Sequence, residues 1–385
     1  SKYWGVYLND FMRLMGWNAN TNLTFGSFHI DIAPIIIVAF FTTLLVFGTK
    51  IGARVDGAMT VLKIAIVFFV VIVGFFYVKA SNFTPFIPPS QPASTVEGSS
   101  AVTGVMTQPL WQFATGMTPS VYGVPGILSG AALVFFAFIG FDVVATASEE
   151  TKNPHKNVPL GIGVGMLLII VMYMLVAVVT TGMVSYADLA KQDSPSLATA
   201  FELVGADWAA KIISFGIVLG LATVVMVLLL GLTRIVFAMS RDGLLPRGLS
   251  KTGKHGTPAA LQIVVGAVVA LVAAFFDIGV LSDMVNIGTL SAFTLVAISI
   301  PIMRKKRPDL PRAFKMPGSP WIPILIAVAN FWLMLNLSVL TWIRFVVWLV
   351  VGFAIYFGYG YWHARLGKGD LTETLSAETD KAVNG

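Results

Sequence analysis

The amino-acid sequence predicts an all-α protein that crosses a membrane many times, and three observations predict this class. Of the 385 residues, 56% are hydrophobic and only 11% are charged, whereas soluble domains carry about 25% charged residues. Apolar runs of about 20 residues recur along the chain, and each is long enough to cross a ~30 Å hydrocarbon core as a helix. Lysine and arginine also gather in alternate loops between these runs, as they do in multispanning proteins.

Nine spans are expected where the apolar runs are bounded by glycine, proline or charged residues. In chain order they lie near 30–49, 57–78, 126–148, 160–184, 211–239, 258–276, 281–302, 321–339 and 343–362. The long connection from Ser81 to Gly123 is rich in Pro, Ser, Thr and Gly, which predicts an irregular loop.

The basic residues orient the predicted spans. Eighteen of the 25 Lys and Arg residues lie in one set of alternate loops and six in the other, which places the first set in the cytoplasm. Residues 30–362 then form the transmembrane domain of a plasma-membrane protein, with 1–29 extracellular and 363–385 a cytoplasmic tail. Because nine spans with a cytoplasmic C-terminus leave Ser1 outside, we expect further residues to precede it.

One stretch interrupts an apolar run. It reads FFAFIGFDVVATASEETKNP and begins at Phe135, with Gly140 and the ionisable Asp142 inside the predicted span. A helix broken near Gly140 leaves backbone N–H and C=O groups in the membrane, which is tolerated only where they line a cavity or are buried in protein. Broken helices of this kind coordinate small ions and zwitterions in transporters. In a straight helix Gly140 would serve only close packing, and the residues alone leave both interpretations open.

Two ionisable residues inside spans are candidates for a functional role, because a charge in a bilayer is costly. Asp142 lies near the cytoplasmic end of its span and is a candidate for gating or for stabilising a helix break. Lys63 lies about two turns inside its span, in GAMTVLKIAIVFFVVIVG. Its side chain either reaches the interface along its aliphatic stem or holds a buried ammonium between helices, as a permanent or titratable cation.

Other chemistry is not indicated. The sequence has no cysteine, no Walker A pattern and no His and Glu at zinc-ligand spacing within a span. All four histidines fall at span ends or in loops, so they form no proton relay. Thr223 and Met226 share a helix face, which most often reflects packing. The net charge of +6 belongs to the loops, so we expect a lipid bilayer around the protein and no nucleic acid, metal or cofactor.

Three stretches carry a family resemblance. They are FFAFIGFDVVATASEETKNPHKNVPLGI, GLTRIVFAMSRDGLLP and RPDLPRAFKMPGSPWIPIL. Together they resemble the amino acid–polyamine–organocation transporters, in particular the cationic amino acid transporter branch, over nearly all of residues 1–362. The resemblance implies a LeuT-like fold of twelve helices with inverted five-helix repeats and discontinuous helices. The nine spans would then be helices four to twelve, the first three would lie upstream, and the span near 126–148 would be the broken sixth helix.

The resemblance also implies roles for individual residues. The substrate-binding residues would be Phe136, Ala137, Phe138, Ile139, Gly140 and Met226, with the carbonyls of Phe136, Ala137 and Ile139 taking the substrate ammonium. Phe136 would close over the substrate, and Asp142 would act in gating at the start of the inner half-helix. Lys63 falls where sodium-independent members carry a lysine, so its ammonium would replace a sodium ion, with Thr223 nearby.

By this resemblance the protein is expected to be a secondary active transporter of L-amino acids, driven by protons, and not an enzyme. Small neutral amino acids such as alanine are favoured, because a cationic side chain needs an acidic partner that the mid-membrane parts of the spans lack. The bulk of Met226 would also shorten the cavity. A cationic amino acid or polyamine uniporter or antiporter, and a transport-inactive amino acid sensor, remain as alternatives. The sequence gives no indication of the oligomeric state.

Overall fold

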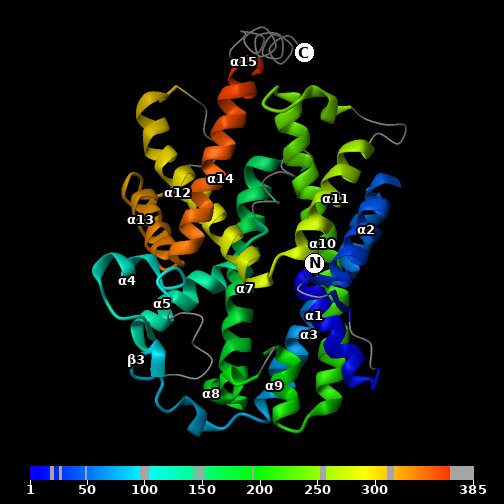
Figure 1. The fold of residues 1–385 in the computed structure, drawn as a ribbon, viewed down its shortest axis with the longest axis vertical. Helices are drawn as coiled ribbons and strands as arrows, with labels where there is room; N and C mark the ends of the chain where they lie inside the picture. The colour runs from blue at the N-terminus through cyan, green and yellow to red at the C-terminus, as the bar shows by residue number, and fades with distance from the viewer. Residues whose placement is uncertain are drawn as a thin grey trace.

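A computed structural model describes most of the chain as a bundle of helices (Figure 1). The described residues are 1–17, 21–25, 28–47, 50–95, 104–141, 144, 151, 153–192, 195–251, 257–309 and 316–364. Within them the strands form only two short antiparallel pairs, β1 (Asn22–Phe25) with β2 (Phe28–Asp31) and β3 (Gln91–Pro92) with β4 (Ser120–Val121). The described chain therefore confirms the all-α class.

Every predicted span overlaps an apolar helix of the described chain. Five helices are long and apolar enough to cross a membrane: α3 (Lys50–Phe75), α7 (Pro154–Met183), α10 (Asp207–Arg241), α12 (Ile278–Lys306) and the run of α14 (Val339–Ile355), η7 (Tyr356–Gly360) and α15 (Tyr361–His363). Four apolar helices are shorter: α2 (Ile32–Phe47), α5 (Gly123–Val134) with η4 (Phe135–Phe138), α11 (Ala259–Phe275) and α13 (Trp321–Leu335). The number and apolar character of these helices indicate a multi-pass membrane protein.

The connections contain short elements. The segment predicted as an irregular loop between spans two and three holds β3, β4, η1 (Ala80–Phe83), η2 (Ala93–Thr95) and α4 (Leu110–Thr115). Elsewhere lie α1 (Lys2–Leu14), α8 (Tyr186–Ala190), α9 (Leu197–Leu203) and η6 (Arg247–Ser250). The division of the chain into extracellular, transmembrane and cytoplasmic segments stays a prediction.

The helix α10 is the centre of the bundle. In its most apolar 18-residue window 44% of the residues are buried, against 6% in α7 and 22% in α12. In Figure 1 it stands among α1, α2, α3 and α11. The outer helices instead expose apolar side chains such as Leu167, which is 64% exposed. Apolar residues exposed along a whole helix suit a lipid surrounding and not water.

Glycines allow the helices around α10 to approach closely. Gly216 of α10 lies against the side chain of Ile66 of α3, and Gly220, one turn further, lies against the stem of Lys63. On the other side of the bundle, Gly266 of α11 lies against Thr42 of α2. A side chain at Gly216 or Gly266 would collide with its neighbour, and one at Gly220 would be tightly packed, which is the small-residue packing typical of membrane helices.

Candidate functional site

The helix that contains FFAFIG is discontinuous, as the family resemblance implies. The α-helix α5 ends at Val134, and the next four residues form one 3₁₀ turn, η4. Ile139 is then extended, with φ −69° and ψ 134°, and Gly140 has φ 129°. Only glycine adopts such a φ readily, because it lacks a Cβ. Gly140 therefore permits the break, and the alternative of a straight helix is wrong.

The backbone at the break is partly paired. The carbonyl of Phe136 accepts the N–H of Ile139 at 3.2 Å, which closes the 3₁₀ turn. The carbonyl of Ala137 accepts the phenol of Tyr173 of α7 at 2.8 Å. The ring of Tyr173 also stands edge-on to Phe138, with centroids 5.2 Å apart. Tyr173 therefore anchors the broken segment to α7, although no sequence pattern singles it out.

The helix α12 supports the other side of the break. The buried Asn286 donates its side-chain amide to the carbonyl of Leu133 at 3.3 Å. The ring of Phe293, about two turns further along α12, contacts Phe135 and Phe141 with centroid distances of 6.1 and 5.0 Å. Residues on both sides of Gly140 thus rest on one rigid helix. These contacts hold the backbone from Leu133 to Phe141 against α12, and a site built on irregular backbone requires such support.

The aromatic ring of Phe136 points toward α1. Its centroid lies 5.9 Å from that of Tyr3, with the planes tilted by 43°. Around Gly140 the space is open, since a Cβ placed there would meet no atom within 4 Å among the described residues. The predicted gating residue Asp142 lies outside the described residues.

Lys63 and Thr223 meet at one residue of α10. A Cβ at Gly220 would lie 3.2 Å from Cγ of Lys63 and 3.6 Å from its Cε, so the lysine stem lies along this glycine. Thr223 is buried and donates its hydroxyl to the carbonyl of Gly220 at 2.9 Å. Lys63 is neither at the surface nor fully enclosed. The structure thus brings together the two residues that the family resemblance pairs.

Met226 occupies a different environment. It is 4% exposed and packs in an apolar cluster with Ile37, Val38 and Phe41 of α2. Thr223 lies one turn before it and is also buried. Neither side chain is among the contacts described above for Phe136, Ala137 and Phe138. In the described chain Met226 is therefore part of the α2–α10 packing, and its role in lining a substrate cavity stays a prediction.

A polar cluster joins α1 to α9 beside this bundle. Arg13 donates two hydrogen bonds to the Glu202 carboxylate, at 2.9 and 3.2 Å, and lies 3.6 Å from Asp10. Asp10 also accepts the hydroxyl of Ser196 at 3.2 Å. Burial raises the pKa of the Asp10 carboxyl, and the bond to Glu202 raises the pKa of Arg13. The cluster ties the start of the chain to the segment between α7 and α10.

Metal-ligating side chains are not clustered in the described residues. No group of three or more His, Cys, Asp or Glu side chains there is placed to hold a metal ion. The half-buried carboxylate of Asp283, near the start of α12, accepts the hydroxyl of Thr341 of α14 at 3.0 Å. The polar groups described at the break are backbone carbonyls and a phenol, which suit binding of a cation and not covalent chemistry.

Comparison with known proteins gives the family. A model of the family described as amino acid permease matches residues 5–360. The branched-chain amino acid permease BcaP of Bacillus subtilis is 39% identical over 373 residues, which are 95% of this chain and 73% of that protein. The methylthioribose transporter of the same species is 38% identical over 86% of this chain and 65% of its own length.

A plant relative extends the comparison. Cationic amino acid transporter 4, vacuolar, of Arabidopsis thaliana is 34% identical over 73% of this chain and 42% of its own length. The chain thus spans less than two thirds of the plant protein and of the methylthioribose transporter. All three relatives are named as transporters or permeases, and none as an enzyme. The chain therefore belongs to the amino acid permease family, within the amino acid–polyamine–organocation transporters.

Proposed function

We propose that the protein is a proton-driven, sodium-independent secondary transporter of neutral L-amino acids in the plasma membrane. The observation that carries the proposal is the break at Ile139 and Gly140, together with the lysine that lies at Gly220 of α10. The first supplies backbone acceptors for an ammonium. The second supplies a fixed cation on a membrane helix where other transporters would need a metal ion.

Substrate binding would use the carbonyls of the 3₁₀ turn. A carbonyl oxygen has two lone pairs, so that of Ala137 can accept from the Tyr173 phenol and from a substrate ammonium together. The charged donor makes the stronger bond. Phe136 would close over the bound molecule, since its ring lies beside the same turn and contacts only the tilted ring of Tyr3 among the described ring pairs.

The substrate would be neutral because of the charges around the break. The acceptors among the described contacts of the break are backbone carbonyls, and none is an acidic side chain. The carboxylate of Asp283 on α12 instead accepts the hydroxyl of Thr341 of α14. A buried cation without an acidic partner is strongly disfavoured. BcaP is named for branched-chain amino acids, which favours neutral substrates as well. Alanine is our first choice and leucine the second, with arginine the contrasting case.

Proton coupling would depend on Lys63. When protonated, its ammonium provides the positive charge between α3 and α10, and loss of the proton removes that charge. A lysine held between helices is well suited to such a change, because a low dielectric penalises its charged form. The helices α3 and α10 would then pack differently in the two protonation states of Lys63. This difference would link proton movement to the opening of the transporter on one side of the membrane.

The test is uptake into liposomes by the complete protein, with labelled alanine, leucine and arginine. We expect an inward proton gradient to stimulate alanine and leucine uptake, sodium to have no effect, and arginine uptake to stay at background. If uptake requires an amino acid inside the liposome, the protein is an exchanger and the proposal of proton-driven transport is wrong. Binding without uptake or exchange would instead indicate a sensor, and uptake of arginine alone would refute the neutral substrate.

A further inference from the structure

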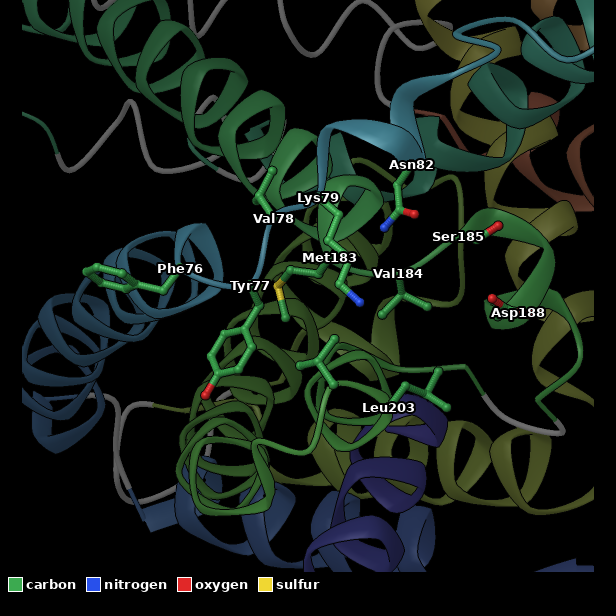
Figure 2. Close-up of a pocket in the computed structure, with 11 residues that line it drawn as sticks. Phe76, Tyr77, Val78, Lys79, Asn82, Met183, Val184, Ser185, Asp188 and Leu203 are labelled. Carbon is green, nitrogen blue, oxygen red and sulfur yellow. The ribbon is translucent and has the colours of Figure 1, made fainter.

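We propose that the protein has a second binding site, for a small zwitterion, in a cavity where α3 and α7 end. The cavity has a volume of about 520 Å³ and is shown in Figure 2. It lies at the end of α7: Met183 lines it and is the last residue of that helix, whereas Tyr173 at the break is ten residues earlier. Ten helical residues rise about 15 Å. The cavity is therefore separate from the helix break, and the inference goes beyond the transport function.

Two opposite charges line this cavity. Lys79 follows the end of α3, and Asp188 belongs to α8. Figure 2 shows the ammonium of Lys79 directed into the space between these elements. Within the described residues Lys79 has no ion pair, whereas Asp188 pairs with the exposed Lys191 at 3.5 Å. A carboxylate or phosphate would bind at Lys79 and an ammonium at Asp188, so the walls match a molecule that carries both charges.

The cationic wall is held in place by the backbone. The N–H of Lys79 and the side-chain amide of Asn82 both donate to the carbonyl of Gly182, at 2.9 and 2.8 Å. Gly182 also lies in close contact with Val78 and Phe83, so a larger residue would not fit there. These contacts fix the chain after α3 on the last turn of α7. The backbone of Lys79 is thus positioned before any ligand binds, and only its side chain has to be ordered, which reduces the cost of binding.

Part of the remaining wall is apolar. Met183 and Val184 are buried, and Leu203 of α9 contributes a partly exposed side chain. An amino acid could place its charged end between Lys79 and Asp188 and a neutral side chain against this wall. The same pairing of ammonium and oxyanion occurs in an ethanolamine phospholipid headgroup. A lipid headgroup could reach the cavity from the membrane surface. Phe76 lines the cavity and is 82% exposed at the end of a membrane helix, where aromatic side chains meet the headgroups.

The experiment uses the absence of cysteine from the 385 residues. Leu203→Cys in the complete protein, with any cysteine outside these residues replaced by serine and in phosphatidylglycerol nanodiscs, would place a thiol in the cavity that a maleimide can alkylate. We expect L-alanine to slow alkylation about threefold or more once most sites are filled, whereas propionate and ethylamine, each with one of the two charges, slow it much less. Lys79→Met and Asp188→Asn should each remove the protection. Lys211→Met, a charge removed outside the cavity, should keep it.

A second series of nanodiscs distinguishes the two sources of the ligand. Protection by alanine identifies a free amino acid, whereas protection that appears only when phosphatidylethanolamine is added identifies the lipid headgroup; both support the site. No protection in either series, or protection that survives both charge substitutions, overturns the proposal. Lys63→Ala should leave the protection unchanged, so that a failure of proton-driven transport and a failure of this second site give different results.

Discussion

Lys63 offers the sharpest prediction for a single residue. Its stem lies on Gly220, whose carbonyl is bonded to Thr223, so the ammonium is held at the crossing of α3 and α10. Lys63→Ala removes that charge and leaves space. We expect alanine uptake to lose its stimulation by an inward proton gradient, while exchange of alanine across the membrane persists. Lys211→Met, on the exposed start of α10, is the matched control. Full stimulation in the Lys63→Ala protein would contradict the proposed role.

Tyr173 is a residue that only the three-dimensional structure identifies. Tyr173→Phe keeps the ring contact with Phe138 and removes the hydrogen bond to the Ala137 carbonyl. A hydrogen bond of this kind contributes about 1 kcal/mol. We expect KM for alanine to rise about fivefold, which corresponds to that free energy, because the carbonyl is no longer held toward the substrate.

The control for this variant is Tyr186→Phe, which removes a phenol from α8, away from the break. It should leave KM unchanged. A lower KM in the Tyr173→Phe protein would mean that the phenol competes with the substrate for the carbonyl instead of positioning it. A change in maximal rate with KM unchanged would place Tyr173 in the opening motion and not in binding.

At the scale of the element, the break depends on backbone conformation. Gly140 has φ 129° and open space around it, so Gly140→Ala meets strain but no collision. A non-glycine residue in such a conformation costs about 1–3 kcal/mol. We expect the variant to fold, because most of the bundle does not depend on this turn, but to lose most alanine uptake as the backbone at the break relaxes.

Gly130→Ala is the matched control for the break. Gly130 lies inside α5, and a Cβ there would also meet no atom within 4 Å. Its helical conformation suits alanine, which is favoured over glycine in helices by about 1 kcal/mol. Uptake and thermal stability should therefore stay equal to or exceed those of the unchanged protein. Equal loss of uptake in both variants would show that this helix is merely sensitive to substitution.

The sequence predicted the helices better than the contacts between them. The apolar runs locate nine helices in the described chain, and Gly140 marks the break because a φ near 129° is adopted readily only by glycine. The anchors of the break are Tyr173 and Asn286, which lie 36 and 153 residues from the carbonyls that they bond. The periodicity of apolar residues along one helix does not predict contacts between residues so far apart in the sequence. Burial of Met226 against α2 likewise depends on how two helices cross, which a single helix does not reveal.

At the scale of the whole molecule, the bundle is organised around α10. This helix buries far more of its apolar window than the other long helices. It presents Gly216 and Gly220 to α3, and the cluster of Met226 and Leu229 to α2. The fixed cation of α3 and the central packing therefore both depend on contacts with α10. A change in the charge of Lys63 would act directly on the element that most of the surrounding helices contact, which is what a coupled transporter requires.

The orientation of the whole molecule is the remaining prediction. The distribution of Lys and Arg places the segment between α3 and α5 outside and the segment after α10 inside. Met117 is half exposed in the first, and Gly248 lies in the second with no atom within 4 Å of its Cβ position.

Since the 385 residues lack cysteine, Met117→Cys and Gly248→Cys each introduce one thiol. In intact cells a membrane-impermeant maleimide should label Met117→Cys only, and Gly248→Cys should react after permeabilisation. The reverse pattern would invert the topology and move the zwitterion cavity to the cytoplasmic side.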